Sequence, residues 1–137
     1  MPHIMIYDDP LSSEEHLKLG MAYEKDGELE NAIKEYKAAA RRLPVAYLYL
    51  GNAHFQKNEL DQAEKFYKKA IKMQSQHADA YNNLAWLYYI KKENLDEAEY
   101  LALRAIELNP SKKDRYKDTL EKVRELKGLI LSPGPKR

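Results

Sequence analysis

Apolar and small residues recur at spacings of three and four along most of the chain, which is the pattern of amphipathic α-helices. The first helix is predicted to begin after Ser12, because a serine followed three residues later by Glu15 can form a capping box. It is predicted to end at Asp26-Gly27, and a second helix is predicted over Leu29 to Arg42. The same two-helix pattern returns twice, and a seventh amphipathic helix over residues 111–128 then has no partner helix.

Small residues recur at nearly fixed intervals, which is the sequence signature of a structural repeat. The predicted first helices carry them at Gly20, Gly51 and Ala85, of which the last two lie 34 positions apart. The predicted second helices carry them at Ala39, Ala70 and Ala105, which are 31 and 35 positions apart. These are places where helices must approach closely, and aromatic residues face them. The pattern resembles the tetratricopeptide repeat, a helix-turn-helix unit of 34 residues.

The resemblance implies an all-α fold, a right-handed α-solenoid of three helix-turn-helix repeats and a seventh, capping helix. The repeats would span residues 13–43, 44–77 and 78–110, and the capping helix residues 111–128, within one domain over residues 12–128. An extended N-terminal arm is predicted over residues 1–11, where Asp8-Asp9-Pro10 favours a turn. A flexible tail is predicted over residues 129–137.

Three departures from the family pattern carry structural expectations. The junction Leu43-Pro44-Val45-Ala46-Tyr47 is three residues short, so the first two units should be joined by a tighter turn. The third unit has one extra residue near Lys92-Glu93. Ala102 stands where an aromatic is expected, and Tyr100 or Leu101 is predicted to fill that volume, because protein cores are densely packed.

Composition excludes several classes of function. A net charge of +1 provides no basic stripe for nucleic acid, and without cysteine there is no disulfide or thiolate site. No apolar run approaches the roughly 18 residues of a membrane span, so no membrane insertion is expected. The opening residues lack the pattern of a signal peptide, which makes a cytoplasmic location the default expectation.

The family resemblance places a binding surface on the concave side, lined by the first helix of each repeat. The residues on that surface would lie one helical turn on either side of the small residue. They are Leu17, Met21 and Glu24 in the first repeat, Leu48, Asn52 and Phe55 in the second, and Asn82, Trp86 and Tyr89 in the third.

This apolar and aromatic set favours a protein or peptide segment with hydrophobic anchors, while Asn52 and Asn82 can hydrogen-bond an exposed peptide backbone. Some family members instead clamp a carboxy-terminal carboxylate with lysine, arginine and asparagine. The corresponding places here hold Leu17, Met21, Tyr49, Asp79 and Asn83. Only the asparagine agrees, so such a clamp is not expected.

The leading hypothesis is therefore a non-catalytic scaffold for protein–protein interaction, with no cofactor. His16, His54 and His77 match no ligand spacing, so no metal site is predicted. Trp86 is expected either to lie open on the concave surface or to be covered by the apolar run Ile4 to Tyr7. One other hypothesis is self-association through the open end of the first helix pair or the tail Leu129 to Leu131. The second is an accessory region of a larger bacterial cysteine-peptidase-like or envelope protein. The second rests on residues 7–17, which resemble the junction before trailing repeats in such proteins.

Overall fold

The computed structural model describes residues 9–131, and this part of the chain is helical, with no strand. The elements are α1 (Ser13–Lys25), α2 (Leu29–Ala39), α3 (Ala46–Gln56), α4 (Leu60–Met73), α5 (Ala78–Lys91), α6 (Leu95–Leu108), the 3-10 turn η1 (Pro110–Lys112) and α7 (Lys113–Leu131). Consecutive helices pack as the pairs α1–α2, α3–α4 and α5–α6, and α7 packs on α5 and α6. The all-α solenoid predicted from the sequence is confirmed.

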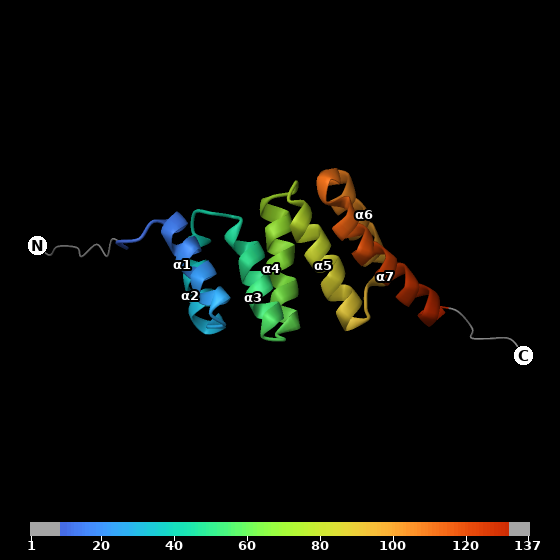
Figure 1. Ribbon diagram of the computed structural model, residues 1–137, viewed down its shortest axis with the longest axis horizontal. Helices are drawn as coiled ribbons and strands as arrows, with labels where there is room; N and C mark the ends of the chain where they lie inside the picture. The colour runs from blue at the N-terminus through green and yellow to red at the C-terminus, as the bar shows by residue number, and fades with distance from the viewer. Residues whose placement is uncertain (1–8, 132–137) are drawn as a thin grey trace, which may run out of the picture.

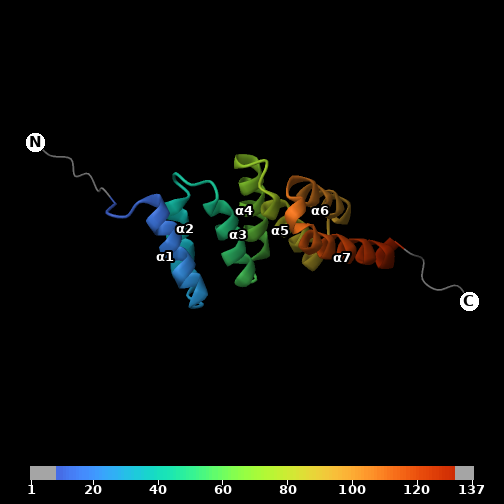
Figure 2. The same ribbon diagram turned by 45° about the horizontal axis from the view of Figure 1, so that its top comes forward.

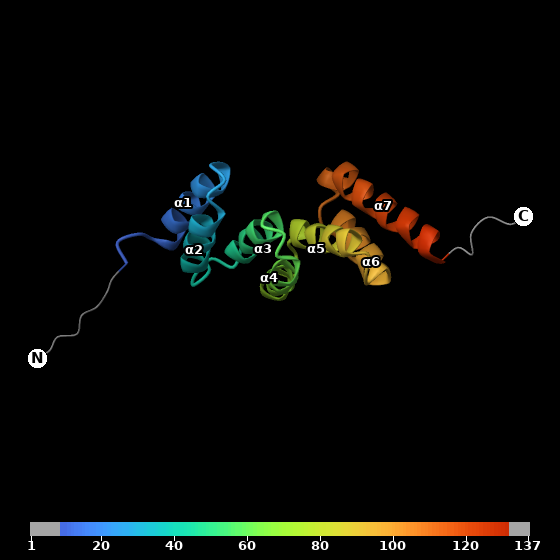
Figure 3. The same ribbon diagram turned by 90° about the horizontal axis from the view of Figure 1, so that it is seen from below.

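The helix pairs follow one another in chain order along the long axis of the molecule (Figures 1 and 2). Seen from below, they form an arch whose inner side is lined by α1, α3, α5 and α7 (Figure 3). Helices α2, α4 and α6 lie on the outer side of the arch. The first helix of each pair therefore faces the concave side, as the repeat pattern predicts.

Local signals in the sequence set the ends of these helices. Ser12 forms the predicted capping box, in which its Oγ accepts from the Glu15 amide at 3.1 Å and its own amide donates to Glu15 Oε1 at 2.8 Å. The first two repeats turn through a left-handed residue, Gly27 and Asn58 respectively. The third turn uses two such residues, Lys92 and Asn94. It is three residues long, like the other two turns, and the extra residue of the third repeat lies in helix α5, which runs six residues past Ala85, whereas α3 runs five past Gly51.

Contact between a glycine and a tyrosine brings the helices of the first two pairs together. A Cβ atom on Gly20 would lie 2.5 Å from Tyr36 Cε1, and one on Gly51 would lie 2.4 Å from Tyr67 Cε1. No side chain fits at either glycine. In the third repeat, Ala85 takes the place of the glycine and Ala102 takes the place of the tyrosine.

In the third repeat, Ala85 and Ala102 are both fully buried in one core cluster. Leu101 is buried in the same cluster and can fill the volume left by the missing aromatic. Tyr100 is 60% exposed, so the suggestion that it fills this volume was wrong.

The short first junction shortens helix α2 and does not produce a tighter turn. Helix α2 has 11 residues and ends at Ala39, not at Arg42 as predicted, whereas α4 has 14. The connection over residues 40–45 is longer than that over residues 74–77. Beyond Ala39, the amides of Arg42 and Leu43 both bond its carbonyl, and Pro44 has no amide hydrogen with which to continue the helix.

The termini fall partly outside the described residues. Helix α7 ends at Leu131, beyond the predicted end at residue 128. In the predicted arm, residues 9–11 form a turn in which the Leu11 amide donates to Asp9 Oδ1 at 2.9 Å. The run Ile4 to Tyr7 and residues 132–137 lie outside the described part of the chain.

The glycine–tyrosine contact predicts that Gly51→Ala destabilises the protein. Overpacking against Tyr67 costs about 1–3 kcal/mol, more than the roughly 0.5–1 kcal/mol that alanine gains over glycine in a helix. Gly128→Ala is the matched control, because Gly128 is exposed on α7 and nothing lies within 4 Å of its added Cβ. Urea unfolding should show a loss of stability for Gly51→Ala and a small gain for Gly128→Ala. Equal stability of the two variants would contradict the packing account.

Candidate functional site: a concave groove

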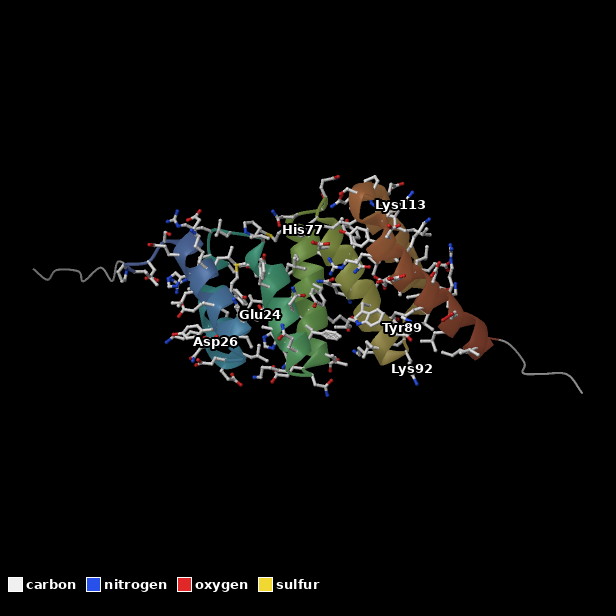
Figure 4. The ribbon with its side chains drawn as sticks, viewed as in Figure 1. Glu24, Asp26, His77, Tyr89, Lys92 and Lys113 are labelled. Carbon is white, nitrogen blue, oxygen red and sulfur yellow. The ribbon has the colours of Figure 1, made fainter. Side chains whose placement is uncertain are left out.

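The inner side of the arch contains a cavity of about 290 Å³ that is reached from all four inner helices. It is lined by Glu24 of α1, Asn52, Phe55 and Gln56 of α3, Tyr67 of α4, Asn83 and Trp86 of α5, and Arg115 of α7. We call this cavity the groove. Figure 4 shows Glu24 on the side of α1 that faces α3, and Tyr89 on the side of α5 that faces α7.

The residues predicted to bind a ligand divide into three groups. Glu24, Asn52, Phe55 and Trp86 line the groove. Tyr89 lies beside Trp86 with 5.0 Å between the ring centroids and the two rings tilted by 32°, and Met21 is 44% exposed on α1. Leu17, Leu48 and Asn82 do not line it.

These last three residues pack within the protein. Leu17 packs against the core of the first repeats. Leu48 is 6% exposed and belongs to the main core cluster, while Asn82 is 4% exposed. The predicted surface exposure of Leu48 and Asn82 was wrong, because both residues are buried within the packed helices.

Four lining residues were not predicted. Asn83 lies one position after Asn82, which turns it about 100° around the helix and into the groove. Gln56 follows Phe55 in the same way. Tyr67 belongs to an outer helix, and its hydroxyl reaches the groove to bond Asn52. Arg115 comes from the capping helix, on which no site residue was predicted.

Buried tyrosines orient the polar side chains of the groove. The Tyr36 hydroxyl donates to Glu24 Oε1 at 2.5 Å, and the Gln56 amide donates to Glu24 Oε2 at 2.6 Å. The Tyr67 hydroxyl donates to Asn52 Oδ1 at 2.7 Å. Burial, with the nearby Glu24 carboxylate, raises the pKa of both tyrosine hydroxyls, so they stay protonated donors at neutral pH.

The two asparagines of the groove form a directional pair. Asn52 Oδ1 accepts from Tyr67 and also from Asn83 Nδ2 at 3.0 Å. This leaves the Asn52 amide group as a donor and the Asn83 oxygen as an acceptor. A donor and an acceptor on neighbouring helices match the hydrogen-bonding groups of an extended peptide.

The α7 side of the groove is charged. Asp79 of α5 accepts from Tyr116 at 2.6 Å, from Lys112 Nζ at 3.0 Å and from Arg115 Nη1 at 3.4 Å. Burial opposes ionisation of Asp79, but the hydrogen bonds from Tyr116 and Lys112 and the two cationic charges keep its pKa below the ordinary value. Asp79 is thus an ion that holds α7 on the third repeat.

The buried histidines are held by carboxylates. His16 lies between Glu35, at 2.6 Å from Nδ1, and Asp9, at 2.5 Å from Nε2. His54 bonds Glu59 at 2.8 Å and stacks on Phe66. Within residues 9–131, no group of three or more histidine or acidic side chains could hold a metal ion. No helix in that range is both long and apolar enough to cross a membrane.

Stacked helix pairs with a concave groove define this chain as an α-solenoid of the helical-repeat class. Two tetratricopeptide repeat models match the sequence, over residues 17–76 and residues 66–100, and together they span more than half of the 137 residues. The chain belongs to the tetratricopeptide repeat family. A comparison with curated proteins found no match.

Solved structures with the same fold include three repeat domains. The first repeat domain of Spaghetti (RPAP3), bound to the HSP90 peptide SRMEEVD, has 22% identity and a TM-score of 0.76, and covers 88% of this chain and 97% of that one. The Yersinia enterocolitica type III secretion chaperone SycD, in complex with a peptide of the translocator YopD, has 24% identity and a TM-score of 0.73, with 83% and 93% coverage. The Sgt2 domain of Aspergillus fumigatus has 18% identity and a TM-score of 0.80, with 91% and 85% coverage.

The His16 cluster predicts a pH dependence of stability. Asp9 and Glu35 only accept hydrogen bonds when ionised, so imidazolium alone can donate to both. The hydrogen bond to Glu35 is the main cause that raises the pKa of His16, with a further contribution from Asp9. The stabilisation is therefore fully present below the unfolded pKa of about 6.5 and is lost as pH rises through the raised folded value.

Urea unfolding of the wild type and a His16→Gln variant at about pH 6 and about pH 9 measures this effect. The difference in unfolding free energy between the two proteins should shrink at the higher pH. A difference that is the same at both values would contradict the assignment of a charged His16.

Proposed function

We propose that this chain is a non-catalytic interaction module that binds a segment of another protein in the groove. The observation that carries the proposal is the oriented pair Asn52 and Asn83 beside the rings of Phe55 and Trp86. The amides supply hydrogen bonds to a peptide backbone, and the rings supply a surface for an apolar side chain. The SycD and RPAP3 domains named above were solved with bound peptides, which supports peptide binding by this chain.

The expected affinity follows from these contacts. Burying one apolar anchor against Phe55 and Trp86 contributes roughly 1.5–3 kcal/mol. Ordering a flexible peptide costs several kcal/mol in return. Because one anchor does not offset this cost, micromolar binding, a net free energy on the order of 8 kcal/mol, requires a further anchor together with hydrogen bonds from the peptide backbone.

The groove is more polar than the sequence indicates, and this polarity limits the kind of peptide that fits it. Five of its eight lining residues are polar or charged and not aromatic, and the other three are Phe55, Tyr67 and Trp86. A wholly apolar helix would leave these polar groups without partners, and such desolvation is costly. An extended segment with one or two hydrophobic anchors and exposed backbone groups satisfies both kinds of side chain.

The other hypotheses concern surfaces outside the groove. Leu129 and Ile130 are exposed near the end of α7, and self-association through them stays a prediction. The accessory role in a larger cysteine-peptidase-like or envelope protein also stays a hypothesis. Either could coexist with a peptide groove.

Selection from a random dodecapeptide phage library on the immobilised full chain tests the proposal. Synthetic peptides from the pool should bind Trp86→Ala or Phe55→Ala about 10- to 100-fold more weakly than the wild type, as expected for the loss of one apolar contact. Tyr100→Ala is the matched control, because that ring is exposed on the outer helix α6. Calorimetric titration gives the affinities, and circular dichroism checks the fold of each variant.

Asn83→Ala is a second variant with little risk to the core, since its side chain is only half-buried. It should weaken binding by removing the acceptor and by freeing Asn52. Peptides that bind these variants as tightly as the wild type, or a library that yields no binder, would refute the groove as the binding site.

A further inference from the structure

The charges at the two ends of the groove have opposite signs. Both oxygens of Glu24 accept hydrogen bonds from neutral donors, Tyr36 and Gln56. Within residues 9–131, Glu24 forms no ion pair with a lysine, arginine or histidine. Its negative charge is therefore oriented by the core but is not neutralised by a neighbouring cation.

At the α7 end of the groove, positive charges outnumber negative charges. Two cations, Lys112 and Arg115, share the single carboxylate of Asp79. The bond from Arg115 is the longer of the two, at 3.4 Å, and the Arg115 side chain is 56% exposed. Because Tyr116 also donates to Asp79, that carboxylate is already well satisfied. The Arg115 guanidinium keeps donors for a further acceptor.

Uncharged groups separate these two ends. Phe55 and Trp86 supply aromatic faces, and Asn52 and Asn83 supply amides, all within the cavity that Glu24 and Arg115 also line. An aromatic face next to a carboxylate is favourable for a lysine or arginine side chain, because the ring attracts a cation and covers its apolar stem.

We infer that the groove selects a peptide segment with a lysine or arginine at the Glu24 end, an apolar anchor in the middle, and an acidic group at the Arg115 end. This inference rests on the proposed function and adds the chemistry and direction of the ligand. The two opposite charges fix which end of the segment lies against α1 and which lies against α7. A segment in the reverse orientation would place like charges together.

The size of each preference follows from the exposure of the groups. Ion pairs at partly exposed sites contribute modestly, so each matched charge should change affinity by about two- to fivefold. Removing both should have a nearly additive effect, since the two ends lie on different helices and share no partner.

Parallel phage selections on the wild type, Glu24→Gln and Arg115→Gln test the charge order. The wild-type pool should be enriched in Lys or Arg on one side of a shared apolar residue and in Asp or Glu on the other side. Glu24→Gln should lose only the basic preference, and Arg115→Gln only the acidic one. Glutamine keeps the shape of Glu24, and the Gln56 amide can rotate to accept a hydrogen bond from it.

Matched peptides then measure the interaction between the selected lysine and Glu24. Replacing the selected lysine by glutamine should weaken binding to the wild type about two- to fivefold and leave binding to Glu24→Gln unchanged. Glu121→Gln is the control, because it makes the same change of charge at an exposed residue of α7 that does not line the groove. A wild-type pool without charge preference, or a basic preference that persists in Glu24→Gln, would overturn the inference.

Failure of the charge order and failure of the groove give different results. If peptides lose affinity for Trp86→Ala but show no charge preference, the groove binds peptides and only the charge order is wrong. If the selected peptides are insensitive to Trp86→Ala, the proposed function itself fails.

Discussion

Contact between a glycine on an inner helix and a tyrosine ring on its outer partner is the constraint on which this structure depends. At Gly20 and Gly51 the ring occupies the space of a Cβ atom, so the ring packs directly against the backbone of the inner helix. Each ring is buried within its helix pair, and its hydroxyl reaches a side chain of the inner helix. There it bonds Glu24 in the first repeat and Asn52 in the second. The contact that packs the repeats thus also positions the side chains of the groove.

This coupling makes the groove preorganised. Glu24 and Asn52 are each held by a buried donor that stays protonated at neutral pH, and neighbouring repeats are joined by the bonds from Gln56 to Glu24 and from Asn83 to Asn52. A ligand then meets side chains that are already oriented, and binding loses less conformational entropy. The third repeat replaces the glycine–tyrosine pair with Ala85 and Ala102, and Trp86 of this repeat lines the groove.

Much of the fold was predictable because local signals in the sequence agree with one another. The Ser12 capping box, the left-handed turns at Gly27 and Asn58, and the recurrence of small residues each indicate the same helix-turn-helix unit. The site was less predictable, because one residue changes direction by about 100° on a helix. A register taken from spacing alone therefore selected Asn82, which is buried, and not Asn83, which lines the groove. Arg115 could not be assigned from repeat spacing, because its place depends on how α7 packs against Asp79.

The most direct test of the account is the fluorescence of Trp86, the only tryptophan of the chain, quenched by acrylamide with and without a library-selected peptide. If Trp86 lies in an open peptide groove, acrylamide quenches it in the free protein, and saturating peptide lowers the quenching constant and shifts the emission to shorter wavelength. A quenching constant and emission maximum that stay the same when the peptide is bound would show that the ligand does not occupy this groove.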